Sequence, residues 1–452
     1  MPITKTIETL FQKYIPSPFV IAILLTLLTM ILALLFTDNP SESSHPITIL
    51  NFWEEGIWDT NLLVFAYQMM LILVLGHVLV LSKPMAWLIS KITIYARDTV
   101  SAVVLVSVTT MLVAFFNWGL GLIFGAIMAR KIGEAAVQKG FKINYPLVGA
   151  AGYVGLMIWH GGMSGSAPLK VAEEAHLTTM MQGILPPDQL ATIPEIITSQ
   201  QTIFSWWNLL LFGILLIVIP FTFYMLARNG KTTQLPDFKT TKETPEDQEK
   251  NDKLDSSKLL TIGFGFIVIV TFFSRYYGES LSPNMLNFLM LGLGIILHGN
   301  FKNFLKAVEE AIGGASGILI QFPLYFGIMG IMKSTGMVTM ISDAFIAVAT
   351  ETTLPIFTFF SAGLVNVFVP SGGGQWAIQG PIVIESALSL GVPLPKAIMA
   401  LAYGDQITNM LQPFWALPLL GITKLKAKEI LPYTLILMLV GSAIYILGLL
   451  LV

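Results

Sequence analysis

Long apolar runs, separated by short polar segments, follow one another along almost the whole chain. A run of about 20 apolar residues is long enough to cross the hydrocarbon core of a bilayer as a helix. Such runs predict nine crossings, near residues 18–37, 61–82, 145–168, 204–227, 259–277, 284–299, 311–333, 396–421 and 431–451. The pattern therefore predicts an all-α polytopic membrane protein whose surroundings are the lipid bilayer.

Two further apolar regions, 100–133 and 355–390, are interrupted near their middle. The first is broken by Asn117, Trp118 and Gly119, and the second by the Pro-Ser-Gly-Gly-Gly run at 370–374. Irregular backbone is tolerated at bilayer depth only where protein buries it or where it lines a water-filled cavity. We therefore predict that each region is a re-entrant hairpin, which enters and leaves the membrane on one side.

The composition fits this picture and excludes several classes of function. Hydrophobic residues make up 54% of the chain and charged residues 12%, against about 25% charged in soluble domains. The chain has no cysteine, which excludes disulfides, thiolate metal sites and thiol nucleophiles. A net charge of −2 argues against a nucleic-acid partner.

The distribution of basic residues predicts a cytoplasmic N-terminus. With that orientation, 21 of the 25 lysine and arginine residues, Lys5 and Lys13 among them, fall on the cytoplasmic side. The predicted outer loop at 38–60 contains acidic residues and no basic ones. The first apolar run exceeds the length of a signal-peptide core, so we expect it to be retained as a span.

Weak similarities between the two halves predict an internal repeat. Asn117 is matched by Asn366, and the break that ends at Pro168 is matched by the one at Pro413. We assign residues 1–230 and 259–452 to two repeats, joined by a cytoplasmic linker at 231–258. Five crossings separate the two starts, so the second repeat would be inverted, as in many transporters. Chance matching among apolar segments is the alternative.

Polar residues within the broken segments are candidate ligands for a coupling ion. Side-chain oxygens, together with carbonyls freed where a helix unwinds, suit Na⁺. The candidates are Ser166, Asn366, Asp405, Thr408 and Asn409. An ionisable residue within a span is a functional candidate by default, so Asp405 is a carrier of H⁺ or a ligand of Na⁺. The alternative is a carboxylate that accepts hydrogen bonds from freed backbone.

The absence of basic residues near the breaks favours a small carboxylate as the substrate. Helix N-termini offer free N–H groups and partial positive charge to such an anion. Neighbouring tryptophans could hold a short apolar tail, although membrane tryptophans more often form interfacial belts. The predicted substrate-binding residues are Asn117, Trp118, Gly119, Ser164, Ser371, Gly372, Gly373, Gly374, Gln375 and Trp376.

An enzyme is the alternative from another class. Ser164 lies in a pattern similar to that of membrane-embedded serine hydrolases, with His298 as a potential base. However, Ser166 occupies the final glycine position of the G-x-S-x-G motif. We therefore predict that the chain is not an enzyme and needs no cofactor beyond a coupling ion.

Four strings resemble a known family. They read NWGLGLIFGA at 117–126, GGMSGS at 161–166, VPSGGGQWAIQGP at 369–381 and AYGDQITNMLQPFWALP at 402–418. They closely resemble the bacterial short-chain fatty acid transporters, of the acetoacetate and butyrate type. The resemblance implies an ion-transporter superfamily of two-hairpin, inverted-repeat carriers. These carriers are homodimeric, work by an elevator motion and are coupled to Na⁺ or H⁺ in the bacterial inner membrane.

The chain departs from the family pattern in two places. The family has glycine where His160 stands, so the resemblance implies that His160 is not an obligatory proton carrier. The superfamily's Ser-Asn-Thr cation triplet is absent, which leaves the choice between Na⁺ and H⁺ open.

Overall fold

The computed structural model is all-helical over the residues it describes, which are 18–39, 42–182, 185–236, 238, 253–279, 283–337, 340, 341, 344 and 347–452. The longer helices before the linker are α2 (Pro18–Phe36), α3 (His45–Ile57), α4 (Thr60–Leu81), α5 (Lys83–Thr93), α6 (Thr99–Phe116), α7 (Trp118–Lys139), α8 (Tyr145–Tyr153) and α12 (Trp206–Asn229). Those after it are α13 (Lys258–Tyr276), α14 (Pro283–His298), α15 (Phe301–Ile312), α16 (Ser316–Ser334), α18 (Leu354–Phe368), α19 (Gly372–Leu390), α20 (Leu394–Thr408), α21 (Pro413–Thr423) and α22 (Ala427–Leu451).

Six of the described helices are long and apolar enough to cross a membrane, namely α2, α4, α6, α12, α13 and α22. The molecule is therefore a multi-pass membrane protein. At 1.5 Å per residue, α6 extends for about 27 Å, which is nearly the full hydrocarbon thickness rather than half of it. The re-entrant hairpins and the count of nine crossings thus stay predictions.

Two of the predicted crossings are not continuous helices. In the region 145–168, α8 tightens into the 3₁₀ turns η1 (Val154–Met157) and η2 (Trp159–Gly161), and a short helix, α9 (Ser166–Lys170), follows. In the region 396–421, α20 passes into η4 (Asn409–Leu411) before α21 begins. The first interruption starts at Val154, earlier than the glycine run that the sequence pointed to.

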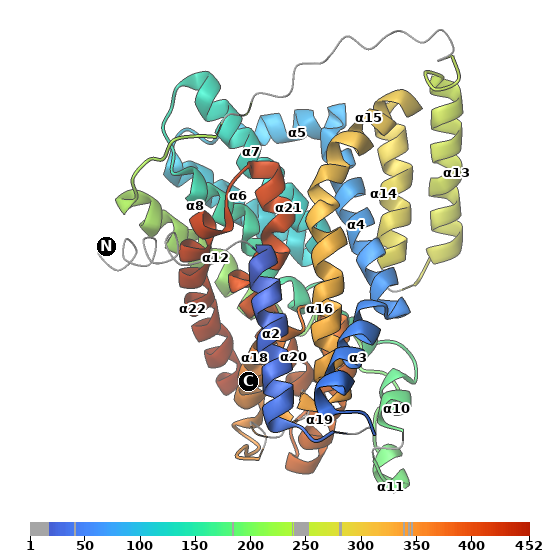
Figure 1. The fold of residues 1–452 in the computed structure, drawn as a ribbon. Helices are drawn as coiled ribbons and strands as arrows, with labels where there is room; N and C mark the ends of the chain where they lie inside the picture. The colour runs from blue at the N-terminus through green and yellow to red at the C-terminus, as the bar shows by residue number, and fades with distance from the viewer. Residues whose placement is uncertain are drawn as a thin grey trace.

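Several short helices occupy regions that were predicted as loops. The helix α3 lies within 38–60 and packs against α16, where a Cβ on Gly330 would stand only 2.3 Å from the Phe52 carbonyl oxygen. The helices α5 and α15 lie at one end of the molecule, and α10 (His176–Met181) and α11 (Pro187–Leu190) at the other (Figure 1). Lys5, Lys13 and residues 239–252 of the predicted linker lie outside the described residues.

Backbone contacts bring the interrupted helices into the interior. A Cβ on Gly125 of α7 would lie 2.1 Å from the Gly152 carbonyl oxygen of α8. A Cβ on Gly404 of α20 would lie equally close, at 2.1 Å, to the Phe359 carbonyl oxygen of α18. Only glycine permits an approach of this kind. The helices α8 and α20 are therefore seated deeply, and their interrupted ends are buried.

Candidate functional site

The site is built where two interrupted segments meet. We call residues 154–165 the first break and residues 409–412 the second break. The Tyr153 hydroxyl, at the start of the first break, contacts the carbonyl oxygens of Asn409 and Gln412 at 2.8 and 3.0 Å. Segments about 250 residues apart in the sequence are thus hydrogen-bonded directly to each other.

Gln406 strengthens this connection from α20. Its Oε1 accepts the backbone N–H of His160 at 2.7 Å and that of Gly161 at 3.0 Å. Its Nε2 donates to the Tyr445 hydroxyl at 2.8 Å, and that hydroxyl donates to the Met157 carbonyl at 2.9 Å. One buried glutamine therefore holds the backbone of the first break at Met157 and at His160 and Gly161.

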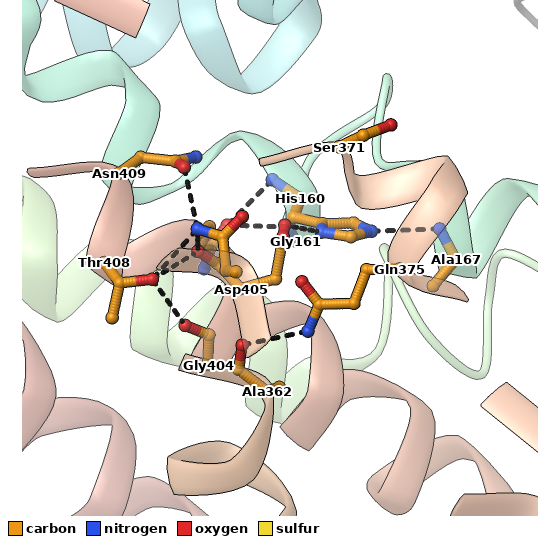
Figure 2. A network of polar contacts seen from close by, with 12 residues as sticks. His160, Gly161, Ala167, Ala362, Ser371, Gln375, Gly404, Asp405, Thr408 and Asn409 are labelled. Carbon is orange, nitrogen blue, oxygen red and sulfur yellow. Dashed lines mark hydrogen bonds and ion pairs between the residues drawn. The ribbon is translucent and has the colours of Figure 1, made fainter. Parts of the chain in front are cut away.

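A buried contact between a histidine and a carboxylate joins the first break to α20. His160 Nδ1 contacts a carboxylate oxygen, Oδ2, of Asp405, and the Ala167 N–H donates to His160 Nε2 at 3.0 Å (Figure 2). The His160 and Asp405 side chains are 0% and 1% exposed. The Trp159 ring stacks on the imidazole with a centroid distance of 4.5 Å. The ring is thus held by its two nitrogens and by one of its faces.

Asn366 of α18 lies in a cage of oxygen atoms. Its Nδ2 donates to the Asp405 carbonyl at 2.7 Å, to Thr408 Oγ1 at 2.9 Å and to Asn409 Oδ1 at 2.9 Å. The structure therefore brings together four of the five predicted coupling-ion residues. The fifth, Ser166, begins α9 directly before Ala167. Their role as ion ligands stays a prediction.

We call the interruptions at 117–119 and 370–374 the first and second tips. The helices that follow the two tips are capped in the same way. Asn117 Oδ1 accepts the Leu120 N–H at 3.0 Å where α7 begins. Ser371 Oγ accepts the Gly374 N–H at 3.2 Å where α19 begins. Such caps satisfy one of the free N–H groups in the first turn of a helix. Both helices thus point their N-terminal ends toward the interior breaks.

The two tips converge on Trp159. The Trp118 ring lies 5.9 Å from the Trp159 ring, centroid to centroid, and the Trp118 N–H donates to Ser164 Oγ at 3.0 Å. On the other side, a Cβ on Gly372 would lie 2.7 Å from Trp159 and 2.8 Å from His160 Cε1. A Cβ on Gly373 would lie 3.9 Å from Ser166. Trp118 and Gly372 therefore both border the ring of Trp159.

Four other predicted substrate-binding residues make different contacts. Gly119 packs on Ile72, and Gly374 packs on Met329. Gln375 Nε2 donates to the Ala362 carbonyl of α18 and to Gln379 Oε1, each at 2.9 Å. Trp376 Nε1 donates to His176 Nε2 on α10 at 3.0 Å. Trp376 is thus turned toward the outer short helices rather than toward the aromatic rings at the first tip.

Among the described residues, the interior contains an acidic side chain but no basic lysine or arginine. Asp405 is the one buried carboxylate among them, and no lysine or arginine is buried. Six buried amide or carboxylate oxygens have no hydrogen-bond partner among the described residues. Two are Asn287 Oδ1 and Gln321 Oε1, and the other four belong to α18, α19, α20 and the second break: Asn366 Oδ1, Gln375 Oε1, Asp405 Oδ1 and Gln412 Oε1. Buried acceptors of this kind are costly unless a donor or a cation completes them.

Comparison with known proteins identifies the family. The family model described as short chain fatty acid transporter matches residues 1–452. The chain belongs to this family. A protein of Escherichia coli (strain K12) that is named for short-chain fatty acid transport is 35% identical over 99% of this chain and 98% of its own length. A Haemophilus influenzae protein with the same name is 37% identical over the same shares.

Solved structures resemble this member of the family less closely. The Alcanivorax borkumensis YdaH transporter covers 96% of the chain, and the chain covers 98% of it, with 15% identity and a TM-score of 0.44. Neisseria gonorrhoeae MtrF, described as illuminating a class of antimetabolite efflux pumps, covers 98% of the chain, and the chain covers 96% of it, with 15% identity and a TM-score of 0.47. At these scores the two likenesses support no further conclusion.

The serine hydrolase alternative finds no support in this short chain fatty acid transporter family member. Ser164 Oγ accepts the Trp118 N–H, whereas His298 Nε2 contacts the Val78 carbonyl of α4 at 2.8 Å. The two residues are therefore engaged in separate contacts.

Sequence reasoning missed three contributors to the site: His160, Gln406 and Tyr153. The resemblance implies that His160 is not an obligatory proton carrier, and the sequence pattern assigns no role to Gln406 or Tyr153. A usable signal was present, because Gln406 is a second polar residue in an apolar span directly after an acid. Neither His160 nor Gln406 has a sequence feature that predicts its partner about 245 positions away.

Proposed function

We propose that the chain is a secondary active transporter of short-chain fatty acids, that is, of small monocarboxylates such as butyrate or acetoacetate. The observation on which this rests is the match to the transporter family from the first residue to the last. The names of two relatives that align with nearly the whole chain point to the same substrates. The geometry of the breaks supports a small anion with a short apolar tail.

The carboxylate would bind between the two tips. The first-turn N–H groups of Gly372 and Gly373 have no acceptor within the helix, and the N-terminus of α19 supplies partial positive charge. Ser166, at the start of α9, lies beside Gly373, and Ser164 precedes it on the first break. No arginine fork is available for a second acid group, because no arginine is buried among the described residues. Monocarboxylates would therefore be preferred over dicarboxylates.

The apolar tail would lie against the aromatic rings. Trp118 stands edge-on to Trp415 at 5.1 Å and tilted against Trp159 at 5.9 Å. These three rings and the glycine backbone form an apolar wall next to polar N–H groups. Such a combination suits an amphipathic acid of a few carbons.

The transport is coupled to a cation in this proposal, with Asn366, Asp405, Thr408, Asn409 and Ser166 forming the ion site. Support comes from the buried carboxylate and from the partnerless oxygens around it. Both H⁺ and Na⁺ are compatible with such oxygens.

The wider architecture is also part of the proposal. The order of helix, tip, helix and interrupted helix recurs, first as α6, α7 and α8 and then as α18, α19 and α20. This order supports an inverted repeat of residues 1–230 and 259–452, with re-entrant hairpins and about nine crossings. We extend it to an elevator-type homodimer in the bacterial inner membrane, with a cytoplasmic N-terminus.

Purified protein in proteoliposomes tests the proposal directly. Vesicles loaded with unlabelled butyrate should take up labelled butyrate by exchange, at a rate well above that of vesicles without protein. Excess acetoacetate should compete and excess succinate should not. Competition by succinate as strong as that by butyrate, or no protein-dependent exchange of any monocarboxylate, would contradict the proposed function.

A further inference from the structure

The hydrogen-bond pattern around His160 fixes where its ring hydrogen lies. A backbone N–H, that of Ala167, donates to Nε2, so Nε2 presents its lone pair and bears no hydrogen. A neutral imidazole carries one N–H, which must then be at Nδ1 and must point at Asp405. His160 therefore donates to Oδ2 of Asp405, which leaves Oδ1 as the carboxylate oxygen open to a proton. With Oδ1 unprotonated, the pair carries one net negative charge.

That charge is concentrated on a single atom. Oδ2 of Asp405 is engaged by His160, whereas Oδ1 is buried and has no hydrogen-bond partner among the described residues. A buried carboxylate oxygen that no donor or cation compensates is strongly unfavourable. Oδ1 is thus an acceptor prepared for a positive species.

Among the described residues, no cation faces this atom from the elements packed around it, and Lys396 of α20 itself lies about two and a half helical turns away. The helix α18 has no ionisable residue, α19 has the exposed Glu385, and α9 ends at the exposed Lys170. The helix α22 has Lys428 and Glu429 in its first turn, far along the helix from Tyr445. The nearby tyrosine hydroxyls of Tyr153, Tyr403 and Tyr445 are hydrogen-bonded to other groups.

The imidazole also borders the tip at which the substrate carboxylate is proposed to bind. A Cβ on Gly372 would stand 2.8 Å from His160 Cε1, so the ring separates the α19 N-terminus from the Asp405 carboxylate. Figure 2 shows Ser371 at this tip on the far side of the ring from Thr408 and Asn409. A bound anion would lie within one ring width of the buried charge.

We propose that Oδ1 of Asp405 is the binding site of the coupling proton, and that His160 is a positioning residue that holds the carboxylate without carrying the proton itself. This inference rests on the proposed function. It deepens it by selecting H⁺ over Na⁺ and by naming the atom. A proton from the aqueous side forms an O–H bond at Oδ1 and is released from Oδ1 to the opposite side. One carboxylate anion travels with it, so each cycle moves no net charge.

The placement explains coupling without any contact between proton and substrate. A substrate anion beside the ring adds a second negative charge close to the first, and like charges at short range disfavour each other. Neutralisation of Asp405 removes that repulsion, so proton binding and carboxylate binding favour each other reciprocally. An unprotonated carrier would bind its substrate more weakly, which limits leakage of protons or acids alone.

Two substitutions separate the roles of the pair. Asp405→Asn keeps the size of the side chain and removes the site of protonation. His160→Gln replaces the ring with a group that can still donate to Asp405 through its amide nitrogen and accept from Ala167 through its oxygen, but that cannot titrate. If the proton resides on Asp405, His160→Gln keeps proton coupling and Asp405→Asn loses it.

The transport assay uses labelled acetoacetate in proteoliposomes, with protein-free vesicles to correct for passive entry of the acid. A gradient of one pH unit, acidic outside, supports accumulation of up to about tenfold by a one-proton carrier. We expect this accumulation for the wild type and for His160→Gln, with a shifted pH profile in the latter. Asp405→Asn should show none while exchange remains measurable. A Na⁺ gradient at equal pH should not drive accumulation.

A binding measurement in detergent gives a second readout that does not depend on transport. Calorimetric titration with acetoacetate at pH 7, in buffers of different ionisation enthalpy, counts the protons taken up. We expect about one proton per ligand for the wild type and His160→Gln, and none for Asp405→Asn.

Each contrary result has a distinct meaning. Loss of pH-driven accumulation in His160→Gln with exchange retained would place the proton on the ring and overturn the assignment. Sodium-driven accumulation in the wild type, or proton uptake by Asp405→Asn, would also overturn it. Wild-type protein that neither binds nor exchanges any monocarboxylate would refute the proposed function, and this inference with it.

Discussion

The first and second breaks are built alike in backbone but differently in side chains. Each follows a helix that tightens into a 3₁₀ turn, and each lies beside a helix capped at its start by a polar side chain. The first break is lined by aromatic rings, Trp118 and Trp159 above all. The second is lined by buried amides and a carboxylate, with Asn366, Asp405 and Asn409 in one network.

This difference separates two tasks that a carrier of fatty acids must perform. An apolar tail is held by area and shape, for which rings are suited. A small cation or proton is held by oxygens, which only polar residues and freed carbonyls supply. In the proposed mechanism, two segments with similar backbone would thus present an apolar surface to the acid and a polar surface to the coupling ion. His160 is the exception, because it belongs to the first break but contacts Asp405, in the polar network beside the second break.

The largest expected effects test whether both breaks depend on close backbone contact. Gly125→Ala and Gly404→Ala each place a Cβ 2.1 Å from a carbonyl oxygen of a neighbouring helix. Backbone cannot move aside cheaply, so we expect each to lower the free energy of unfolding by about 1–3 kcal/mol or more. Thermal or denaturant unfolding in detergent measures this.

The matched control for these substitutions is Gly213→Ala in α12. A Cβ at Gly213 would meet nothing within 4 Å, so this change should be neutral or stabilise by up to about 1 kcal/mol through helix propensity. If Gly404→Ala unfolds like Gly213→Ala, the seating of α20 on α18 is wrong. If Gly125→Ala alone is tolerated, the two breaks are held differently.

The second prediction tests the aromatic character of the first break. Trp118→Ala should weaken binding of butyrate more than that of acetate, because butyrate has two more methylenes to bury. At about 0.8 kcal/mol for each methylene, the preference for butyrate over acetate should fall by up to about 1.6 kcal/mol of binding free energy, or roughly tenfold in the affinity ratio. Half-saturation of exchange for the two acids measures the ratio.

Trp376→Phe is the control for this experiment. It removes the N–H that donates to His176 and keeps an aromatic ring, so the ratio between butyrate and acetate should stay as in the wild type. An unchanged ratio in Trp118→Ala would remove the rings of the first break from tail binding.

The third prediction concerns the caps, which we treat as equivalent in the two halves. Asn117→Ala and Ser371→Ala each remove the acceptor for an N–H of the first helical turn. Each should destabilise the protein by about 1 kcal/mol. The exchanges Asn117→Ser and Ser371→Asn should destabilise the protein by only a few tenths of a kcal/mol, because both residue types cap well. A cost for Asn117→Ser equal to that of Asn117→Ala would show a role other than capping.

The smallest expected effect concerns pH and the contact between α10 and α19. Burial, with Lys170 adding to it, holds the pKa of His176 below its usual value of 6.5. The unfolded chain therefore binds a proton more readily than the folded one, so stability falls as the pH drops below about 6.5. Protonation also removes the lone pair of Nε2 that accepts the Trp376 N–H.

Melting temperatures at pH 8 and pH 6 measure this effect. The decrease on acidification should be smaller in His176→Asn, which can accept a hydrogen bond without titrating. Identical decreases in wild type and His176→Asn would exclude His176 as the cause.

The polar network of the second break was predictable from the sequence because membrane chemistry leaves few options. Asn366, Asp405, Thr408 and Asn409 lie in apolar segments, and polar groups in such segments must find one another or a ligand. The all-helical class followed from the length of the apolar runs for the same reason. These inferences need no knowledge of which segments touch.

Other features depended on contacts that a pattern does not encode. The pairing of His160 with Asp405 joins residues 245 positions apart. Trp376 follows Gln375 by one position, yet a helical step of about 100° turns it toward α10. The helix α3 lies in a segment of mixed polarity, so no apolar run announced it. Long-range packing decides all three.

The hydroxyl of Tyr153 has a consequence for the way the molecule could work. It is hydrogen-bonded to two carbonyl oxygens of the second break, and Gln406 accepts hydrogen bonds from two N–H groups of the first break. In the proposed elevator mechanism, two breaks joined by these hydrogen bonds would move as one rigid body. A binding pocket carried whole from one face of the membrane to the other offers its occupants the same affinity on either side. The gradients of substrate and coupling ion alone then set the direction of net transport. The same carrier would import the acid when its concentration inside is low and export it when that concentration is high.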